Sequence, residues 1–197
     1  SYSERQRYSE TTPKKRLAVD QPTAQPVEAL LRRSDIDALG PVRHVHQHNP
    51  KAIRLTRSLS SLTGLETLGV HLVTLTEGRF STEYHRHHED EEFIYILSGR
   101  GLARIGEHHH EVASGDFMGF NTQSEAHSLY NPHPEDLVYL MGGTRSPIDI
   151  CDYPDLDLRQ FRVHGDRTAV QRKHLTGANP STNQANPSPD FEQKRYE

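Results

Sequence analysis

The sequence predicts an all-β domain, built as a sandwich or barrel of short strands, and two observations carry this prediction. First, short apolar or alternating runs rich in β-branched and aromatic residues recur between positions 68 and 151, at intervals of roughly ten residues. Second, glycine- and proline-marked turn signals separate these runs, among them Ser98-Gly99 and Asn131-Pro132. Long helical periodicity is missing from 65 to 150, so few helices are expected there.

The expected elements follow in chain order. Residues 27–39, VEALLRRSDIDAL, suit one or two short helical turns near the N-terminus. The predicted strands then span 68–75, 92–97, 101–106, 117–120, 126–131, 137–141 and 148–151.

The 197 residues suit one domain of moderate size with extensions at both ends. We expect a polar N-terminal extension over 1–27, a single domain over 28–176 with its motifs in 68–153, and a polar C-terminal tail over 177–197. Both extensions have compositions that cannot offset the entropy of ordering by themselves. No internal repeat is evident, which argues against a duplicated two-domain arrangement.

Charge and cysteine usage exclude several classes of protein. The formal charge is −4 with both signs interspersed, so no basic stripe for nucleic acid is present, and PKKR at 13–16 is interpreted as solvated surface. The single cysteine, Cys151, excludes an internal disulfide and fits a reducing compartment. No apolar signal core and no run of ~20 apolar residues occur. We therefore expect a cytoplasmic protein without nucleic-acid or membrane partners.

The stretch YHRHHEDEEFIYILSGRG, from Tyr84 to Gly101, gathers histidines and acids directly before an apolar run. On a helix, His85, His88, Glu89 and Glu92 would share one face. On a strand, His85 and His87 would point to the same side. The aromatic and β-branched run that follows, and the turn after it, favour the strand.

Glu92 follows His87 by five residues, an odd separation that would place it on the opposite face of one straight strand. We therefore predict a bend over 88–91, after which Glu92 starts a second strand and faces the same cavity as His85 and His87. Two histidines and a carboxylate form an incomplete metal site. His127, which enters the predicted strand 126–131, is the natural further ligand.

These residues resemble the two motifs of the cupin superfamily. The first reads His85-x-His87-x4-Glu92-x6-Gly99, and the second reads Gly115 followed by His127-x3-Asn131. The sequence departs from the family pattern at NTQSEA (121–126), where the usual proline and glycine are replaced. The resemblance implies a double-stranded β-helix, the jelly-roll barrel of cupins. It is strongest to small single-domain bacterial cupins, whose members often carry the provisional label sugar-phosphate isomerase.

The resemblance implies that His85, His87, Glu92 and His127 bind one divalent metal ion: zinc, manganese, iron or nickel. The metal would act as a Lewis acid on a small hydroxy-carbonyl or sugar-like metabolite, in isomerase or lyase chemistry. Two alternatives stay open: a metal-dependent dioxygenase, and a non-catalytic module that binds a small ligand. No catalytic acid or base is identified.

Strand parity predicts the cavity wall. If Glu92 and His127 face inward, so do Ile94, Ile96 and Leu129, whereas Phe93 and Tyr95 face away. Polar groups would come from other strands. Arg104, Tyr139, His71 and Arg54 are candidates, although a surface or structural role is preferred for each. Arg104 is the candidate considered for binding a phosphate.

The remaining histidine clusters are interpreted as structural or exposed. His44, His46 and His48 alternate and could share a strand face, but no acid adjoins them, and Asn49-Pro50 is interpreted as a turn. His108–His110 is expected at an exposed hairpin tip. A homodimer is predicted because open sheet edges need covering, with 155–176 as further contact surface.

Overall fold

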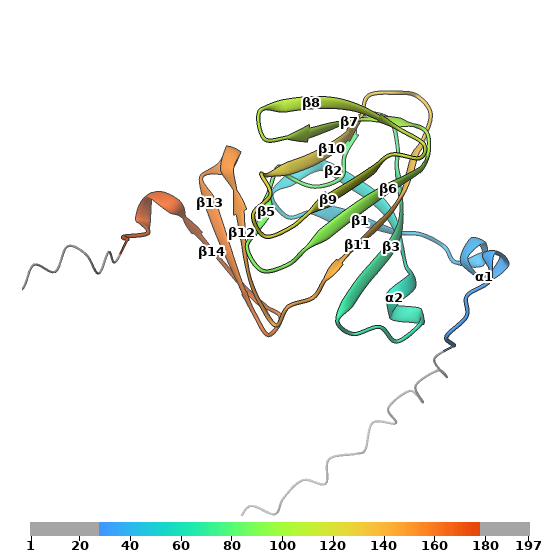
Figure 1. Ribbon diagram of the computed structural model, residues 1–197, viewed down its shortest axis with the longest axis horizontal. Helices are drawn as coiled ribbons and strands as arrows, with labels where there is room; N and C mark the ends of the chain where they lie inside the picture. Colours follow the sequence, from blue (N-terminus) through green and yellow to red (C-terminus); the bar gives the residue numbers. More distant parts are fainter. Residues whose placement is uncertain (1–27, 178–197) are drawn as a thin grey trace, which may run out of the picture.

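The computed structural model describes residues 28–177, so both predicted polar tails, apart from Gly177, lie outside the described residues. Short helices comprise α1 (Arg33–Ala38), α2 (Leu59–Leu62), η1 (Pro154–Leu156) and η2 (Arg172–His174), the last two of the 3-10 type. The strands are β1 (Val42–His46), β2 (Asn49–Ser58), β3 (Leu68–Leu75), β4 (Arg79–Phe80), β5 (Arg86–His87), β6 (Glu92–Ser98), β7 (Arg100–Ile105), β8 (His108–Ala113), β9 (Phe117–Phe120), β10 (His127–Asn131), β11 (Leu137–Thr144), β12 (Ile148–Tyr153), β13 (Leu158–Val163) and β14 (Asp166–Gln171). The predicted all-β class is confirmed (Figure 1).

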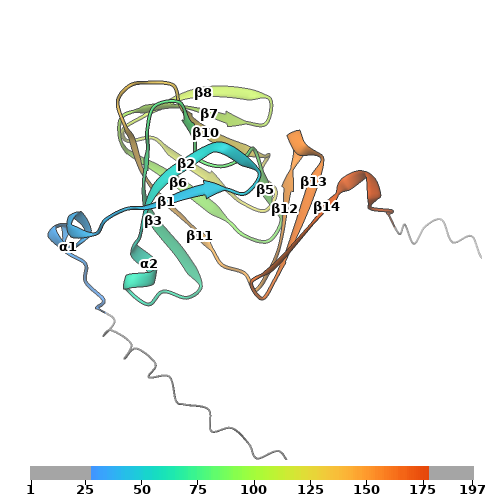
Figure 2. The ribbon, with the colours of Figure 1, turned by 180° about the vertical axis from the view of Figure 1, so that it is seen from behind.

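The strands form three sheets, and every pairing between them is antiparallel. A six-stranded sheet has the order β1-β2-β3-β11-β6-β9, and a four-stranded sheet has the order β4-β10-β7-β8. These two sheets enclose the barrel, and the third, β14-β13-β12-β5, lies beside it in both views (Figures 1 and 2). An isolated bridge between His85 and His127 joins the β5 segment to β10.

The core lies between the first two sheets and follows the alternation of each strand. Ile94 and Ile96 on β6 are buried, whereas Tyr95 between them is 39% exposed. Leu129 on β10 and Tyr139 on β11 are also buried in this cluster. The predicted inward and outward faces of these strands are therefore confirmed, because each strand buries only one face.

The histidine-rich segments differ in part from the prediction. Pro50 lies inside β2, and the turn between β1 and β2 falls two residues earlier, at Gln47-His48. Proline is tolerated there because it stands at the second position of the strand, beside the hairpin turn. His108–His110 is exposed as expected, but it forms the start of β8 rather than a hairpin tip.

Gly99, in the turn between β6 and β7, has little space for a side chain. Its φ is +82°, and a Cβ atom there would lie 2.3 Å from the carbonyl oxygen of Asp136. Gly78 has a similar φ of +71° but nothing within 4 Å. We expect Gly78→Ala to lower the free energy of unfolding by about 1 kcal/mol and Gly99→Ala by about 3 kcal/mol. Urea unfolding of the two variants measures this difference, and equal losses would contradict the clash.

Asp152 ties the third sheet together. Its carboxylate accepts hydrogen bonds from Nε and Nη2 of Arg159, each 2.7 Å long, and lies 2.9 Å from Nε2 of His88. Burial alone would raise the pKa of Asp152, but the bonds to Arg159 and His88 outweigh it and lower the pKa from 3.8 to about 2.

A lowered pKa of this kind makes stability depend on pH. The ionised Asp152 stabilises the fold above pH 3.8, its value in the unfolded chain, and this contribution is lost as the pH falls toward about 2. We expect Asp152→Asn to be less stable than the wild type at neutral pH, with the difference shrinking between pH 4 and pH 2. Thermal melts across this range test it, and a constant difference would contradict it.

Candidate metal centre

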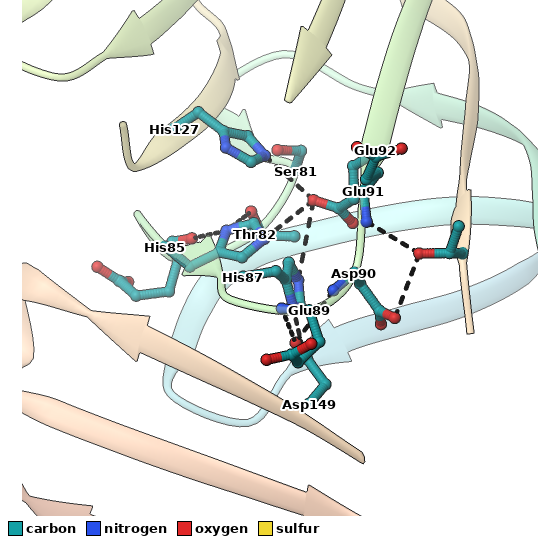
Figure 3. A network of polar contacts seen from close by, with 12 residues as sticks. Ser81, Thr82, His85, His87, Glu89, Asp90, Glu91, Glu92, His127 and Asp149 are labelled. Atoms are coloured by element: carbon teal, nitrogen blue, oxygen red, sulfur yellow. Dashed lines mark hydrogen bonds and ion pairs between the residues drawn. The ribbon is translucent and has the colours of Figure 1, made fainter. Parts of the chain in front are cut away.

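The four predicted ligand residues meet at one end of the barrel (Figure 3). Glu92 opens β6, His87 ends β5, His85 directly precedes β5, and His127 opens β10. Oε2 of Glu92 lies 3.4 Å from Nε2 of His85, 3.8 Å from Nε2 of His87 and 3.1 Å from Nε2 of His127. The structure thus places three imidazole nitrogens around one carboxylate oxygen.

The predicted bend over 88–91 produces this arrangement. No strand occupies these four residues, so the chain turns between β5 and β6 and reverses the parity that a straight strand would impose. Glu92 can then face the same side as His85 and His87, whose ring centroids lie 5.0 Å apart.

Neighbouring groups orient the first two histidines. Nδ1 of His85 lies 2.9 Å from the carbonyl oxygen of Glu83, and Nδ1 of His87 lies 2.6 Å from Oδ2 of Asp149. An Nδ1–H that donates to such an acceptor leaves the lone pair on Nε2, the atom directed at Glu92.

His127 is held by packing instead. Its ring stacks on Phe120 with a centroid distance of 3.5 Å and an interplanar angle of 1°, and its Nδ1 has no hydrogen-bond partner among the described residues. Asn131, the last residue of the second motif, is fully buried and donates to the carbonyl oxygens of Leu75 and Glu135. Its role is therefore to fix the end of β10 rather than to face the cavity.

Electrostatics favour an ionised carboxylate at the centre. Burial would raise the pKa of Glu92, but its contacts with the imidazoles of His127 and His85 outweigh burial and hold the pKa well below its usual value. Burial lowers the pKa of His127 despite its bond to Glu92. For His87, burial is outweighed by the bond to Asp149 and the charge of Glu92, so its pKa is raised.

Two buried acids that the sequence did not single out support this centre. Asp149 on β12 accepts from Nδ1 of His87 and from the backbone amides of Glu89 and Asp90. Asp90 in the bend bonds the backbone amide of Ser146 and lies 2.5 Å from the guanidinium of Arg162. The sequence did contain one signal for Asp149, because it stands between two isoleucines in a predicted strand. An acid in such an apolar strand is expected to be buried, and a buried acid requires a polar partner.

The centre opens into a cavity of about 290 Å³ between the barrel and the third sheet. Of the four polar candidates, Arg54 and His71 line it. Arg104 does not: it bonds Asp155 at 2.6 Å and stacks over the ring of Tyr84 outside this cavity. Tyr139 is fully buried in the core.

The donor set suits a divalent metal ion. His85, His87 and Glu92 offer ligand atoms that all lie within 4.8 Å of one another, and Nε2 of His127 adjoins the same carboxylate. Ligand atoms that bind one ion at about 2.1 Å lie about 3 Å apart, close to the spacings seen here. Nitrogen and carboxylate ligands fit zinc, manganese, iron or nickel.

A jelly-roll barrel with three histidines and one glutamate at its mouth is the architecture of a cupin. The model of the Cupin domain family matches residues 71–143. The chain belongs to the cupin superfamily.

Solved structures agree with this assignment. A protein from Acidithiobacillus ferrooxidans that carries the provisional name sugar phosphate isomerase is 36% identical, with a TM-score of 0.76 over 77% of this chain and 97% of that chain. A sugar phosphate isomerase of the cupin superfamily from Silicibacter pomeroyi is 26% identical, with a TM-score of 0.59 over 62% of this chain and 80% of that chain. No curated protein matches the chain. Among residues 28–177, no helix has the length and apolar character needed to cross a membrane.

Proposed function

We propose that this cupin is an enzyme that binds one divalent metal ion through His85, His87, Glu92 and His127 and isomerises a small hydroxy-carbonyl metabolite. The observation that carries the proposal is the convergence of three Nε2 atoms on one Glu92 oxygen. The names of the two similar structures support a sugar phosphate as the substrate class.

A bound metal ion would supply Lewis-acid polarisation of a carbonyl or hydroxyl oxygen. The residues of the chain prepare for it. Asp149 and the carbonyl of Glu83 hold His87 and His85 in the orientation that presents Nε2. Phe120 stacks against His127 and screens it from water, and Ile94 and Ile96 form an apolar wall behind Glu92. The cavity of about 290 Å³ lies at the lower end of ligand sites, which suits a small metabolite.

The reaction class is tested by loading the protein with iron, manganese or zinc and incubating each form with aldose and ketose phosphates under air and under argon. The proposal expects interconversion under both gases. Turnover confined to the iron form in air, with stoichiometric oxygen uptake, would replace the isomerase with a dioxygenase. A ligand that raises the melting temperature without turnover would identify a binding module instead.

We further propose that the chain acts as a homodimer. Tyr95 and Leu97 on β6 and Phe117 on β9 expose apolar side chains on the outer face of the six-stranded sheet, with Phe117 64% exposed. Covering such a face is a common reason for self-association. Light scattering at micromolar concentration is expected to give twice the 22.4 kDa chain mass, and a monomer mass would contradict it.

A further inference from the structure

The cavity beside the metal centre is lined by arginines that lack acidic partners. Arg54 on β2, Arg145 just after β11 and Arg167 on β14 come from three separate parts of the chain and line the same cavity. None of the three lies within 4.0 Å of a carboxylate of the described residues. By contrast, Arg100, Arg104, Arg159 and Arg162 each form an ion pair.

Arg54 stands at the centre of this group. Its Nη1 donates to the carbonyl oxygen of Ser81, but its Nε is buried without a hydrogen-bond partner in residues 28–177. Thr56 Oγ1 and His71 Nδ1 are buried and unpartnered in the same way. Buried polar groups without partners are costly, so the described residues satisfy the guanidinium of Arg54 only in part.

Two histidines connect the arginines. His44 pairs with Arg54 across β1 and β2, and its pKa is lowered by burial and by the charges of Arg54 and Arg167. Burial and the charges of Arg145 and Arg54 lower the pKa of His71 likewise. The guanidinium of Arg145 and the ring of His71 also share the space beside Gly69, where an added Cβ would lie 3.1 Å from Nε of Arg145. Arg145 therefore lies beside His71, and Arg54 lies opposite His44 in the β1–β2 pair.

The charges in the cavity do not balance. Four arginines and three carboxylates line it. The carboxylates are already engaged: Asp90 pairs with Arg162, Asp149 with His87, and Glu92 lies among the ligand histidines. A divalent ion would add two further positive charges. The excess positive charge lies where it would attract an anionic substrate.

We infer that Arg54, Arg145 and Arg167 form a subsite for the phosphoryl group of the substrate, on the β2 and β14 side of the metal cavity. Guanidinium groups bind phosphate oxygens through charge-assisted, often bidentate hydrogen bonds, and three of them suit a dianion better than a single carboxylate. The inference rests on the proposed function, because it names the residues that would bind the phosphoryl end of the same substrate. The subsite itself consists of protein side chains and does not include the metal ion.

The test is a ³¹P NMR or calorimetric titration of inorganic phosphate into the full chain after metal removal with a chelator. We expect Arg54→Gln and Arg167→Gln each to weaken phosphate binding by about tenfold or more. Arg100→Gln, which removes an exposed arginine paired with Glu135, is the matched control and should bind as the wild type does. Because Arg167 is exposed on β14, its replacement does not threaten folding, which circular dichroism verifies.

Each outcome decides between named alternatives. Wild-type protein that binds no phosphate, or equal binding by all variants, overturns the subsite. Acetate that binds as tightly as phosphate reassigns it to a carboxylate. Metal content, measured separately, should be unchanged in Arg54→Gln. Protein that binds phosphate but no metal would keep this inference and overturn the proposed function, and protein that binds metal but no phosphate would do the reverse.

Discussion

The double variant His85→Ala/His127→Ala is expected to lose nearly all bound metal, whereas the wild type should hold one ion per chain. The change removes two of three imidazoles and leaves only His87 and Glu92, whose Nε2 and Oε2 atoms lie 3.8 Å apart. One imidazole and one carboxylate do not complete the coordination of these ions, so the content should fall below about one tenth of the wild-type value. Elemental analysis of protein purified without a histidine tag measures this.

The matched control is His108→Ala/His110→Ala, which removes two exposed histidines from β8. It should retain the full metal content, and both variants should remain folded by circular dichroism. If the His85/His127 variant kept its full stoichiometry, the ligand assignment would be wrong. The metal would then belong to His44–His48 or to His108–His110, and loss in the β8 variant alone would identify the latter.

The sequence was sufficient to predict the four residues that meet at the centre. The odd spacing between His87 and Glu92 required a bend over 88–91, and the structure contains it. The supporting acids were harder to predict, because Asp149 reaches His87 across 62 positions of sequence. Strand parity fixes which way a side chain points, but it does not say which distant strand comes to lie opposite.

Four of the strands that the sequence analysis missed share one physical property: they face the polar cavity. β3 and β9 were predicted with their observed bounds because both are short, mainly apolar runs with turn signals nearby. β1, β2, β13 and β14 were not predicted. These strands direct His44, Arg54, Arg162 and Arg167 to the cavity, so their inner faces are not apolar. Hydrophobic alternation indicates a strand that packs against an apolar core. It does not indicate a strand that lines a charged site.

The buried pair between Asp90 and Arg162 is the second place where a large effect is expected. Asp90 is 5% exposed, and its carboxylate lies 2.5 Å from Nη2 of Arg162 and accepts from the Ser146 amide at 2.8 Å. The pair links the bend before β6 to β13 and to the segment after β11. Asp90 therefore holds the bend that aims Glu92 at the histidines.

We expect Asp90→Asn to lower the free energy of unfolding by about 3 kcal/mol, because the Arg162 side chain is only 20% exposed and keeps only the longer carboxylate contact of 4.0 Å to Asp149. Glu135→Gln removes the carboxylate of an exposed arginine pair, with Arg100, and should cost about 0 to 1 kcal/mol. Adding Arg162→Met to Asp90→Asn should recover part of the loss, since no unpaired charge then remains. Urea unfolding of the four proteins measures these differences. Equal losses for Asp90→Asn and Glu135→Gln, or a further loss in the double variant, would show that the ion pair does not hold the bend. In that case the backbone bonds of Asp149 to Glu89 and Asp90 would have to position Glu92 alone.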